Sequence, residues 1–358
     1  MPQLRTGHWL KGDWHVHSRH STDTSHNPVG AIIAFAEEIG FDYLAITDHD
    51  NHVLGAVADN TWADPDHRSE TVQLLYGAEL TAPRGHINIL SATPYDHQRV
   101  FDARDARDWD LLAVKRELGV HFSANHPTTK NHYGYSFDLA DSIEIWNKST
   151  WEKNIPAQRI WDDMLLSGRM LGARGGSDAH HGLPPELDFT RPQTLEATAN
   201  YVGTPTTWLF ASERSPAAIL EALERCRASV SANPNNPRVE LWADTDGDGM
   251  MDMMMGDNVQ PTGQPIQFEV RLIGGAVPRA PYKVNIIKNR SDFACLPIDR
   301  DTQVLRFIDT PLAGERTYYR VEIEGPQSPF PQVPNCTTQS GTMVAISNPL
   351  YFNYNPDF

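Results

Sequence analysis

The sequence is poor in cysteine, in positive charge and in long apolar runs. It contains 3 Cys among 358 residues, and 30 Lys and Arg face 46 Asp and Glu, which gives a formal net charge of −16. This charge argues against a nucleic-acid backbone or an anionic membrane surface as the main partner, because such binders concentrate Lys and Arg. An anionic substrate would need local positive charge, most simply from bound metal.

Membrane and export segments are also missing from the sequence. No run of about 18 apolar residues occurs, so no membrane span is predicted. Residues 1–11 contain no apolar core of the kind that signal peptides carry. Because the first motif follows soon after the start of the chain, we expect a mature form whose leader is missing, and this favours a periplasmic or secreted protein over a cytoplasmic one.

The first two thirds of the chain alternate short apolar runs with amphipathic segments, and 40% of all residues are hydrophobic. This alternation predicts an α/β fold with parallel strands and crossover helices between residues 11 and 240. Helices are expected after Pro28, with Gly40 ending the first one, and over residues 155–166 and 216–225. Strands are expected at residues 13–17, 43–47, 74–79, 87–91, 120–124, 142–146 and 170–173.

The sequence pattern changes beyond residue 232, where no segment has the spacing of apolar residues expected for a helix. Proline and glycine punctuate short alternating runs at residues 266–273, 282–287, 318–324 and 343–346. This pattern predicts a small antiparallel β domain, most simply a sandwich. We therefore divide the chain into residues 1–240 and 241–358, and expect the two parts to pack together because no linker separates them.

Side chains of the types that bind metals recur at the ends of the expected strands. In a barrel of parallel strands these ends meet at one face, so residues far apart in sequence share a pocket. In a strand, His-x-His also places both rings on the same side. Imidazole with carboxylate suits Zn, Mn or Fe better than calcium. The residues in question are His15, His17, Asp48, His49, Glu79, His126, Asp178 and His180.

The ordered set of motifs resembles the polymerase and histidinol phosphatase (PHP) superfamily over about residues 10–235. The motifs are HVH at 15–17, TDHD at 47–50, GAELT at 77–81, NHP at 125–127 and GSDAH at 176–180. The resemblance implies a distorted (β/α)7 barrel that holds two or three divalent metals for hydrolysis. GHINIL, IEIWN, VGTPTTWLF and AISNPLY resemble the branch that includes carbaryl-hydrolase-like metallohydrolases.

The resemblance also implies which residues bind each metal. The first ion would be held by His15, His17, Asp178 and a bridging Glu79, the second by Glu79, His86 and His126, and the third by Asp23, His49 and His180. Asp48 is expected to orient His49 rather than to bind metal.

A water shared by two divalent ions is acidified toward neutral pH and supplies a nucleophile. Three functions remain open: a phosphomonoesterase or phosphodiesterase, which we favour; a carbamate, ester or amide hydrolase; and a non-catalytic metal-binding scaffold. Arg19, Arg84 and Lys148 are candidate contacts to an anionic small-molecule substrate, and His20 and His132 are candidate general acids. The sequence predicts no oligomeric state.

A second candidate ion-binding site lies in the sequence DTDGDGMMD. Asp244, Asp246, Asp248 and Asp252 have the spacing of an EF-hand-like calcium loop, although Met255 stands where a bidentate Glu is expected. Calcium and a plain turn both remain open there. Cys295 and Cys336 fall in the β domain, where a disulfide would favour an oxidising compartment.

Overall fold

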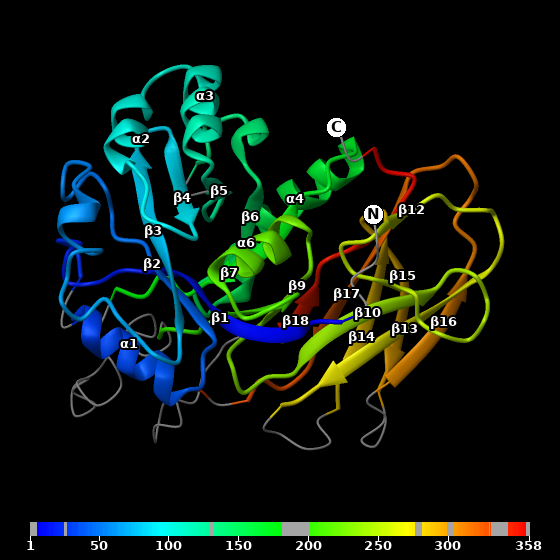
Figure 1. The fold of residues 1–358 in the computed structure, drawn as a ribbon. Helices are drawn as coiled ribbons and strands as arrows, with labels where there is room; N and C mark the ends of the chain where they lie inside the picture. The colour runs from blue at the N-terminus through cyan, green and yellow to red at the C-terminus, as the bar shows by residue number, and fades with distance from the viewer. Residues whose placement is uncertain are drawn as a thin grey trace.

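The structure is a computed structural model, and it describes residues 6–24, 27–128, 132–180, 201–275, 281–298, 304–328, 330 and 343–355. Figure 1 shows the helices on one side of the molecule and, on the other, strands that belong mostly to the C-terminal third of the chain. The prediction of a mixed α/β fold is confirmed.

The N-terminal region alternates strands with helices. Its strands are β1 (His8–Val16), β2 (Tyr43–Ile46), β3 (Gln73–Ala82), β4 (Gly85–Ser91), β5 (His121–Ala124), β6 (Ser142–Asn147), β7 (Gly172–Gly176), β8 (Thr206–Ala211) and β9 (Ala228–Ser231). Its helices are α1 (Val29–Glu38), α2 (His97–Ala103), α3 (Asp108–Leu118), α4 (Ile155–Ser167) and α6 (Pro216–Glu224), with short 3-10 turns η1 (Val57–Asp59), η2 (Phe137–Leu139) and η3 (Trp151–Asn154).

The first helix illustrates why these elements form where they do. Pro28 precedes α1, where its fixed φ suits a helix start. Ile32, Ile33 and Ala36 recur at helical spacing and are buried on one face. Gly40 follows the helix with φ +69°, a conformation that glycine adopts without steric cost. The predicted boundaries of this helix are thus confirmed.

The strands of this region lie in one sheet in the order β9-β8-β1-β2-β3-β4-β5-β6-β7. The β1-β2-β3 and β5-β6-β7 pairings are parallel, as predicted. The prediction of parallel strands is wrong for β4, which is antiparallel to both β3 and β5, and for β8, which is antiparallel to β1 and β9. Pro83 and Arg84 form a two-residue turn between the paired residues Ala82 and Gly85, so β3 and β4 are a hairpin.

The two ends of this arrangement approach each other beside the predicted site. Val16 at the end of β1 forms a parallel bridge with Ala179, which follows β7. His17 N also donates to Ala179 O at 3.0 Å. The ends of β1 and β7 therefore lie side by side, although neither is adjacent to the other in the sheet order.

The C-terminal region consists of strands. They are β10 (Arg238–Asp244), β11 (Met253–Met254), β12 (Asn258–Val259), β13 (Ile266–Ile273), β14 (Lys283–Lys288), β15 (Ser291–Pro297), β16 (Val304–Asp309), β17 (Thr317–Glu324), β18 (Met343–Ser347) and β19 (Leu350–Phe352). A four-stranded sheet, β11-β10-β13-β16, packs through Phe268 and Val270 against Val321 and Val344 of the larger sheet. The larger sheet is continuous with the N-terminal region, because β9 pairs with both β8 and β18.

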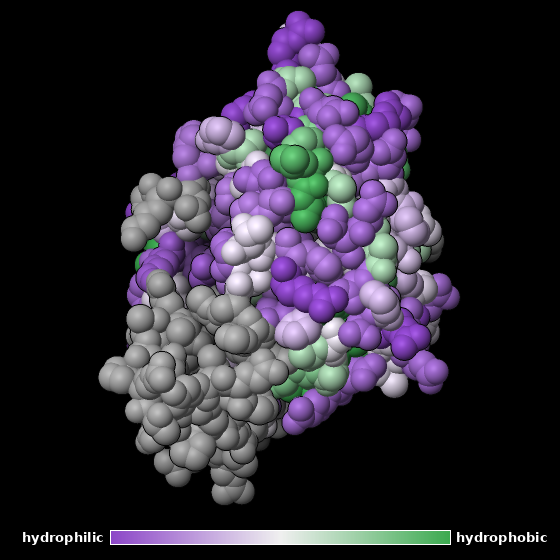
Figure 2. Space-filling view, turned by 90° about the vertical axis from the view of Figure 1, so that its left-hand side faces the viewer, coloured by the Kyte–Doolittle hydropathy of each residue, from purple (hydrophilic) through white to green (hydrophobic). Residues whose placement is uncertain are grey.

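One face of the surface is mainly polar where the structure describes it. In the space-filling view, the described residues of that face are mostly hydrophilic, with hydrophobic residues in small groups between them (Figure 2). No helix within the described ranges is long and apolar enough to cross a membrane.

Candidate metal centre

Glu79 lies at the centre of a cluster of imidazoles. The residue is fully buried in β3, a strand that continues three residues beyond the predicted end at Glu79. Glu79 Oε2 lies 3.4 Å from His15 Nε2, 3.3 Å from His17 Nε2 and 2.9 Å from His49 Nδ1. Glu79 Oε1 lies 3.0 Å from His86 Nδ1 and 3.3 Å from His126 Nε2. Five rings thus converge on one carboxylate.

The chain reaches Glu79 from four strands. His15 and His17 come from the end of β1, and His49 follows β2. His126 follows β5, whereas His86 is the second residue of β4. Because β4 runs antiparallel to its neighbours, its beginning lies where the neighbouring strands end, and this brings His86 into the cluster.

Asp178 completes the predicted first ligand set. Its Oδ1 lies 3.5 Å from His15 Nε2 and 3.2 Å from His17 Nε2, and the two Nε2 atoms are 3.1 Å apart. Donor atoms of His15, His17 and Glu79 can reach a common point, and Asp178 lies beside both rings.

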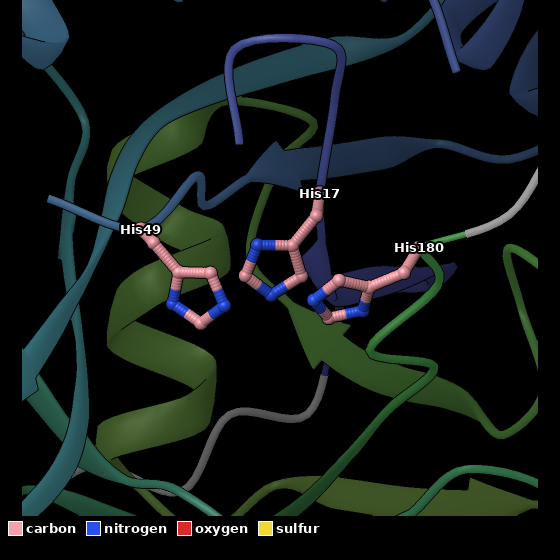
Figure 3. A group of neighbouring side chains, drawn as sticks. All are labelled: His17, His49 and His180. Carbon is pink, nitrogen blue, oxygen red and sulfur yellow. The ribbon is translucent and has the colours of Figure 1, made fainter. Parts of the chain in front are cut away.

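The predicted third set lies beside the first. Asp23 Oδ2 is 3.3 Å from both His49 Nε2 and His180 Nε2. Figure 3 shows the ring of His17 between those of His49 and His180, with centroid distances of 4.3 and 4.0 Å. The ring nitrogens of these three histidines can reach a common point. His17 thus adjoins both sets.

Three non-glycine residues in or beside the cluster have left-handed backbone conformations. The φ angles are +27° for His126, +59° for Lys148 and +49° for Asp178. Such conformations cost free energy and persist only where surrounding contacts enforce them, as is common at functional sites. Here they turn the chain sharply just after β5, β6 and β7.

The carboxylates and imidazoles of the cluster shift one another's pKa values strongly. Burial alone would lower the pKa of His49, but Glu79 and Asp23 outweigh it and raise the value to about 10. Burial opposes ionisation of Glu79 as well, yet His15 and His49 hold its pKa well below the usual range. In the metal-free protein these carboxylates therefore favour protons on His49 and on the other rings whose pKa is raised, which are His15, His86 and His180. His17 differs, because burial and the neighbouring His180 lower its pKa.

Glu144 and Arg174 are both fully buried next to the cluster and were not among the predicted site residues. Glu144 Oε1 lies 3.0 Å from His15 Nδ1 and 2.8 Å from Arg174 NH1. A charged residue inside an otherwise apolar strand, as in residues 142–146, was the available signal, because buried charges require partners.

Asp48 is connected to His49 through the hydroxyl of Ser21, and its role in orienting His49 stays a prediction. Its carboxylate accepts hydrogen bonds from the hydroxyls of Ser18, Ser21 and Thr61. Ser21 Oγ in turn lies 3.2 Å from His17 Nδ1 and accepts a bond from His49 N. Through Ser21, Asp48 is therefore connected to the ring of His17 and to the backbone of His49.

Of the residues predicted to contact the substrate, Lys148 lies next to the cluster, whereas Arg19 and Arg84 pair with carboxylates elsewhere. Lys148 Nζ lies 3.3 Å from Asp178 Oδ2, and its side chain is 43% exposed, so it borders the cluster. Arg19 instead pairs with Asp64 at 2.7 Å, and His20 contacts the same carboxylate at 2.8 Å. Arg84, the third candidate contact, pairs with Asp108.

A cavity of about 250 Å³ opens beside the second ligand set. It is lined by Ala82, Pro83, Gly85, His86, Asn125, His126 and His132. Of the two candidate general acids, His132 therefore faces the space next to the cluster.

The Asp-rich loop is only partly organised as an ion site. Carboxylate oxygens of Asp244, Asp246 and Asp248 lie within 4.8 Å of one another. Asp252 instead accepts two bonds from Thr245, and Asp244 accepts the backbone N–H groups of Gly247 and Gly249. Cys295 is exposed on β15, and its predicted partner Cys336 lies outside the described residues.

Comparisons with known proteins agree with the sequence motifs. A family model described as "PHP domain" matches residues 13–137, which include Asp23 and every predicted ligand up to His126. Asp178 and His180 lie beyond the match. No curated protein matches the chain.

One solved structure is similar over most of its length. It is a two-domain protein from Bacteroides vulgatus, described as containing a predicted PHP-like metal-dependent phosphoesterase. The identity is 16%, the alignment covers 97% of each chain and the TM-score is 0.47.

Proposed function

We propose that this protein is a metal-dependent hydrolase that acts on phosphoesters at the Glu79 cluster. The observation that carries the proposal is the convergence of His15, His17, His49, His86 and His126 on the two oxygens of Glu79. The match of residues 13–137 to the PHP domain supports it.

The cluster fits divalent metal. Glu79 Oε2 is buried and has no hydrogen-bond partner among the described residues, although three ring nitrogens lie within 3.4 Å. A buried carboxylate oxygen normally finds a partner, and one faced by imidazole nitrogens suits a cation such as Zn, Mn or Fe. We propose the three ligand sets given above, with Glu79 shared between the first two.

When bound, the divalent ions would activate water at neutral pH and stabilise negative charge on the phosphoryl group. The chain itself contributes position and access. Lys148 borders the first set and is placed to contact a phosphoryl oxygen, while the cavity beside His86 and His126 provides room for a small substrate. His132 at that cavity is placed to protonate a leaving group.

A substrate panel on metal-reconstituted protein tests this function. Turnover of nitrophenyl phosphate monoesters or diesters, without turnover of naphthyl carbamates, is the expected result. The reverse pattern would favour the carbamate or ester hydrolase of the carbaryl-hydrolase-like branch. Absence of both activities, together with less than one ion per chain, would favour a non-catalytic scaffold.

We also propose that residues 1–240 form a (β/α)7-type unit and residues 241–358 a β unit. The apolar cluster around Phe268 and Val321 supports a separate C-terminal core. Calcium at Asp244, Asp246 and Asp248 and an extracytoplasmic location remain part of the proposal. Isothermal titration with Ca²⁺ and a thiol count under non-reducing conditions test these two points.

A further inference from the structure

Glu144 forms hydrogen bonds with residues of both the first and the second predicted ligand sets. Its Oε1 accepts from His15 Nδ1 at 3.0 Å and from Arg174 NH1 at 2.8 Å. Its Oε2 accepts from the backbone N–H of His126 at 2.9 Å and from Asn147 Nδ2 at 3.1 Å. One buried carboxylate is therefore bonded to a ligand of the first set and to the backbone of a ligand of the second.

Arg174 continues the connection toward Glu79. Its NH2 donates to Asn125 Oδ1 at 2.6 Å, and its Nε donates to Ser123 Oγ at 2.7 Å. Asn125 Nδ2 then donates to Glu79 Oε1 at 2.8 Å. The hydrogen bonds thus run from His15 through Glu144, Arg174 and Asn125 to Glu79.

The backbone is shaped to admit this network. A Cβ atom on Gly176 would lie 2.4 Å from Glu144 Oε1, 2.5 Å from His15 Cβ and 3.0 Å from Arg174 NH1. Only glycine at this position of β7 lets the three side chains approach so closely.

We propose that Glu144, Arg174 and Asn125 are positioning residues that aim His15 and Glu79 at the ions and couple the first two metal positions. The inference rests on the proposed function, because it presumes that the cluster binds metal. A carboxylate can only accept from His15 Nδ1, so this bond places the proton on Nδ1 and leaves Nε2 free to bind a cation. Asn125 likewise restrains the carboxylate of Glu79.

Glu144 itself is not placed to be a ligand, although its carboxylate could reach a point shared with His15 and His126. The guanidinium of Arg174 occupies the same oxygen that faces His15, and its positive charge would repel a cation bound there. Among the described residues, no hydrogen bond joins Glu144, Arg174 or Asn125 directly to Asp23 or His180. Asn147 links Glu144 to Asp178 of the first set, and His180 lies one contact further away. The network should therefore act on the first two positions and not on the third.

A Zn²⁺ titration of the metal-stripped full chain, in competition with a chelating dye, tests the proposal. We expect Glu144→Gln to weaken Zn²⁺ binding about 10- to 100-fold while the number of ions at saturation stays the same. The matched control is Glu269→Gln, since Glu269 is also buried and paired with arginine, on β13. This control should bind Zn²⁺ within about twofold of the wild type.

Unchanged affinity in Glu144→Gln would overturn the proposal, and so would the loss of one whole ion, which would make Glu144 a ligand. The effect should persist in a His180→Ala background and shrink in a His15→Ala background, because His15 is the predicted ligand whose ring donates to Glu144. Equal effects in both backgrounds would contradict the assigned route. If Glu144→Gln does not fold, Asn125→Ala must show weakened binding instead.

The wild-type titration distinguishes failure of the proposed function from failure of the positioning network. Wild-type protein that binds no Zn²⁺ contradicts the proposed function itself. Wild-type protein that binds Zn²⁺ as tightly as Glu144→Gln and Asn125→Ala contradicts only the positioning network.

Discussion

Two buried arginine–carboxylate clusters in this protein differ in how fully their members are satisfied. Between α4 and β17, Asp162 accepts from Tyr318 OH at 2.7 Å, from Arg320 Nε at 3.0 Å and from Arg320 NH2 at 2.9 Å. In the candidate metal centre, Arg174 and Glu144 are bonded, yet Glu79 Oε2 next to them has no hydrogen-bond partner among the described residues. The first cluster is complete by itself and joins two regions of the fold. The second leaves one buried carboxylate oxygen without a hydrogen bond, and the proposed cation would satisfy it.

Removing the charge of Glu79 should have the largest effect on activity and on bound metal. Metal activation lowers the reaction barrier by several kcal/mol. Glu79→Gln should therefore reduce phosphoesterase activity by about 10³-fold or more and lower the amount of bound metal. Asp178→Asn should act in the same direction. Steady-state rates and metal content measure both effects, with Glu269→Gln as the control. Full activity in both site variants would mean that the ligand assignment is wrong.

The junction cluster should respond in the opposite way. Asp162→Asn leaves the buried Arg320 with less compensation, so the free energy of unfolding should fall by about 3–5 kcal/mol. Metal content and affinity should not change, since the cluster is separate from Glu79. Denaturant unfolding of the metal-stripped protein and a Zn²⁺ titration provide the two measurements. Loss of metal without loss of stability would reverse the roles assigned to the two clusters.

The pH dependence distinguishes the two clusters further. The pKa of His49 is raised to about 10 from an ordinary value of 6.5, so its contribution to metal-free stability is fully present below pH 6.5 and is lost as the pH rises through 10. Metal must displace this proton, so affinity should rise about tenfold per pH unit for each proton released. Zn²⁺ titrations at pH 6, 7 and 8 test this. An affinity independent of pH would contradict the protonated cluster.

The smallest effect is expected at the edge of the site. Lys148→Met should raise KM for a phosphoester about five- to tenfold, because a partly exposed charge contributes modestly to binding, and should change kcat less. Arg19→Met is the matched control, since Arg19 pairs with Asp64 and should leave KM within about twofold. Steady-state kinetics measure both variants. Equal effects in the two would show that Lys148 has no special contact with substrate.

Much of this site could be predicted from the sequence, because its residues follow strands in the order of known motifs. The side chains predicted as ligands lie close together around Glu79, Asp178 and Asp23, and their division into three sets stays a prediction. The strand positions were predictable because apolar runs of four to six residues bounded by turn residues are local signals.

What the sequence did not reveal depends on contacts between distant residues. The pairing of Glu144 with Arg174 and His15 spans 30 and 129 positions, and spacing alone carries no information on it. The β3-β4 hairpin had a local signal in Pro83, Arg84 and Gly85 that the parallel-strand interpretation overlooked. The shared sheet through β9 and β18 was not predictable, because a local pattern does not specify a strand's distant partner.

Elemental analysis of the purified protein shows whether the Glu79 cluster holds metal. We expect two or three divalent transition-metal ions per chain in the wild type and in Glu269→Gln, and less than one in Glu79→Gln. A wild type with less than one ion per chain after incubation with Zn²⁺, Mn²⁺ or Fe²⁺, or a Glu79→Gln variant that retains the full complement, would contradict it.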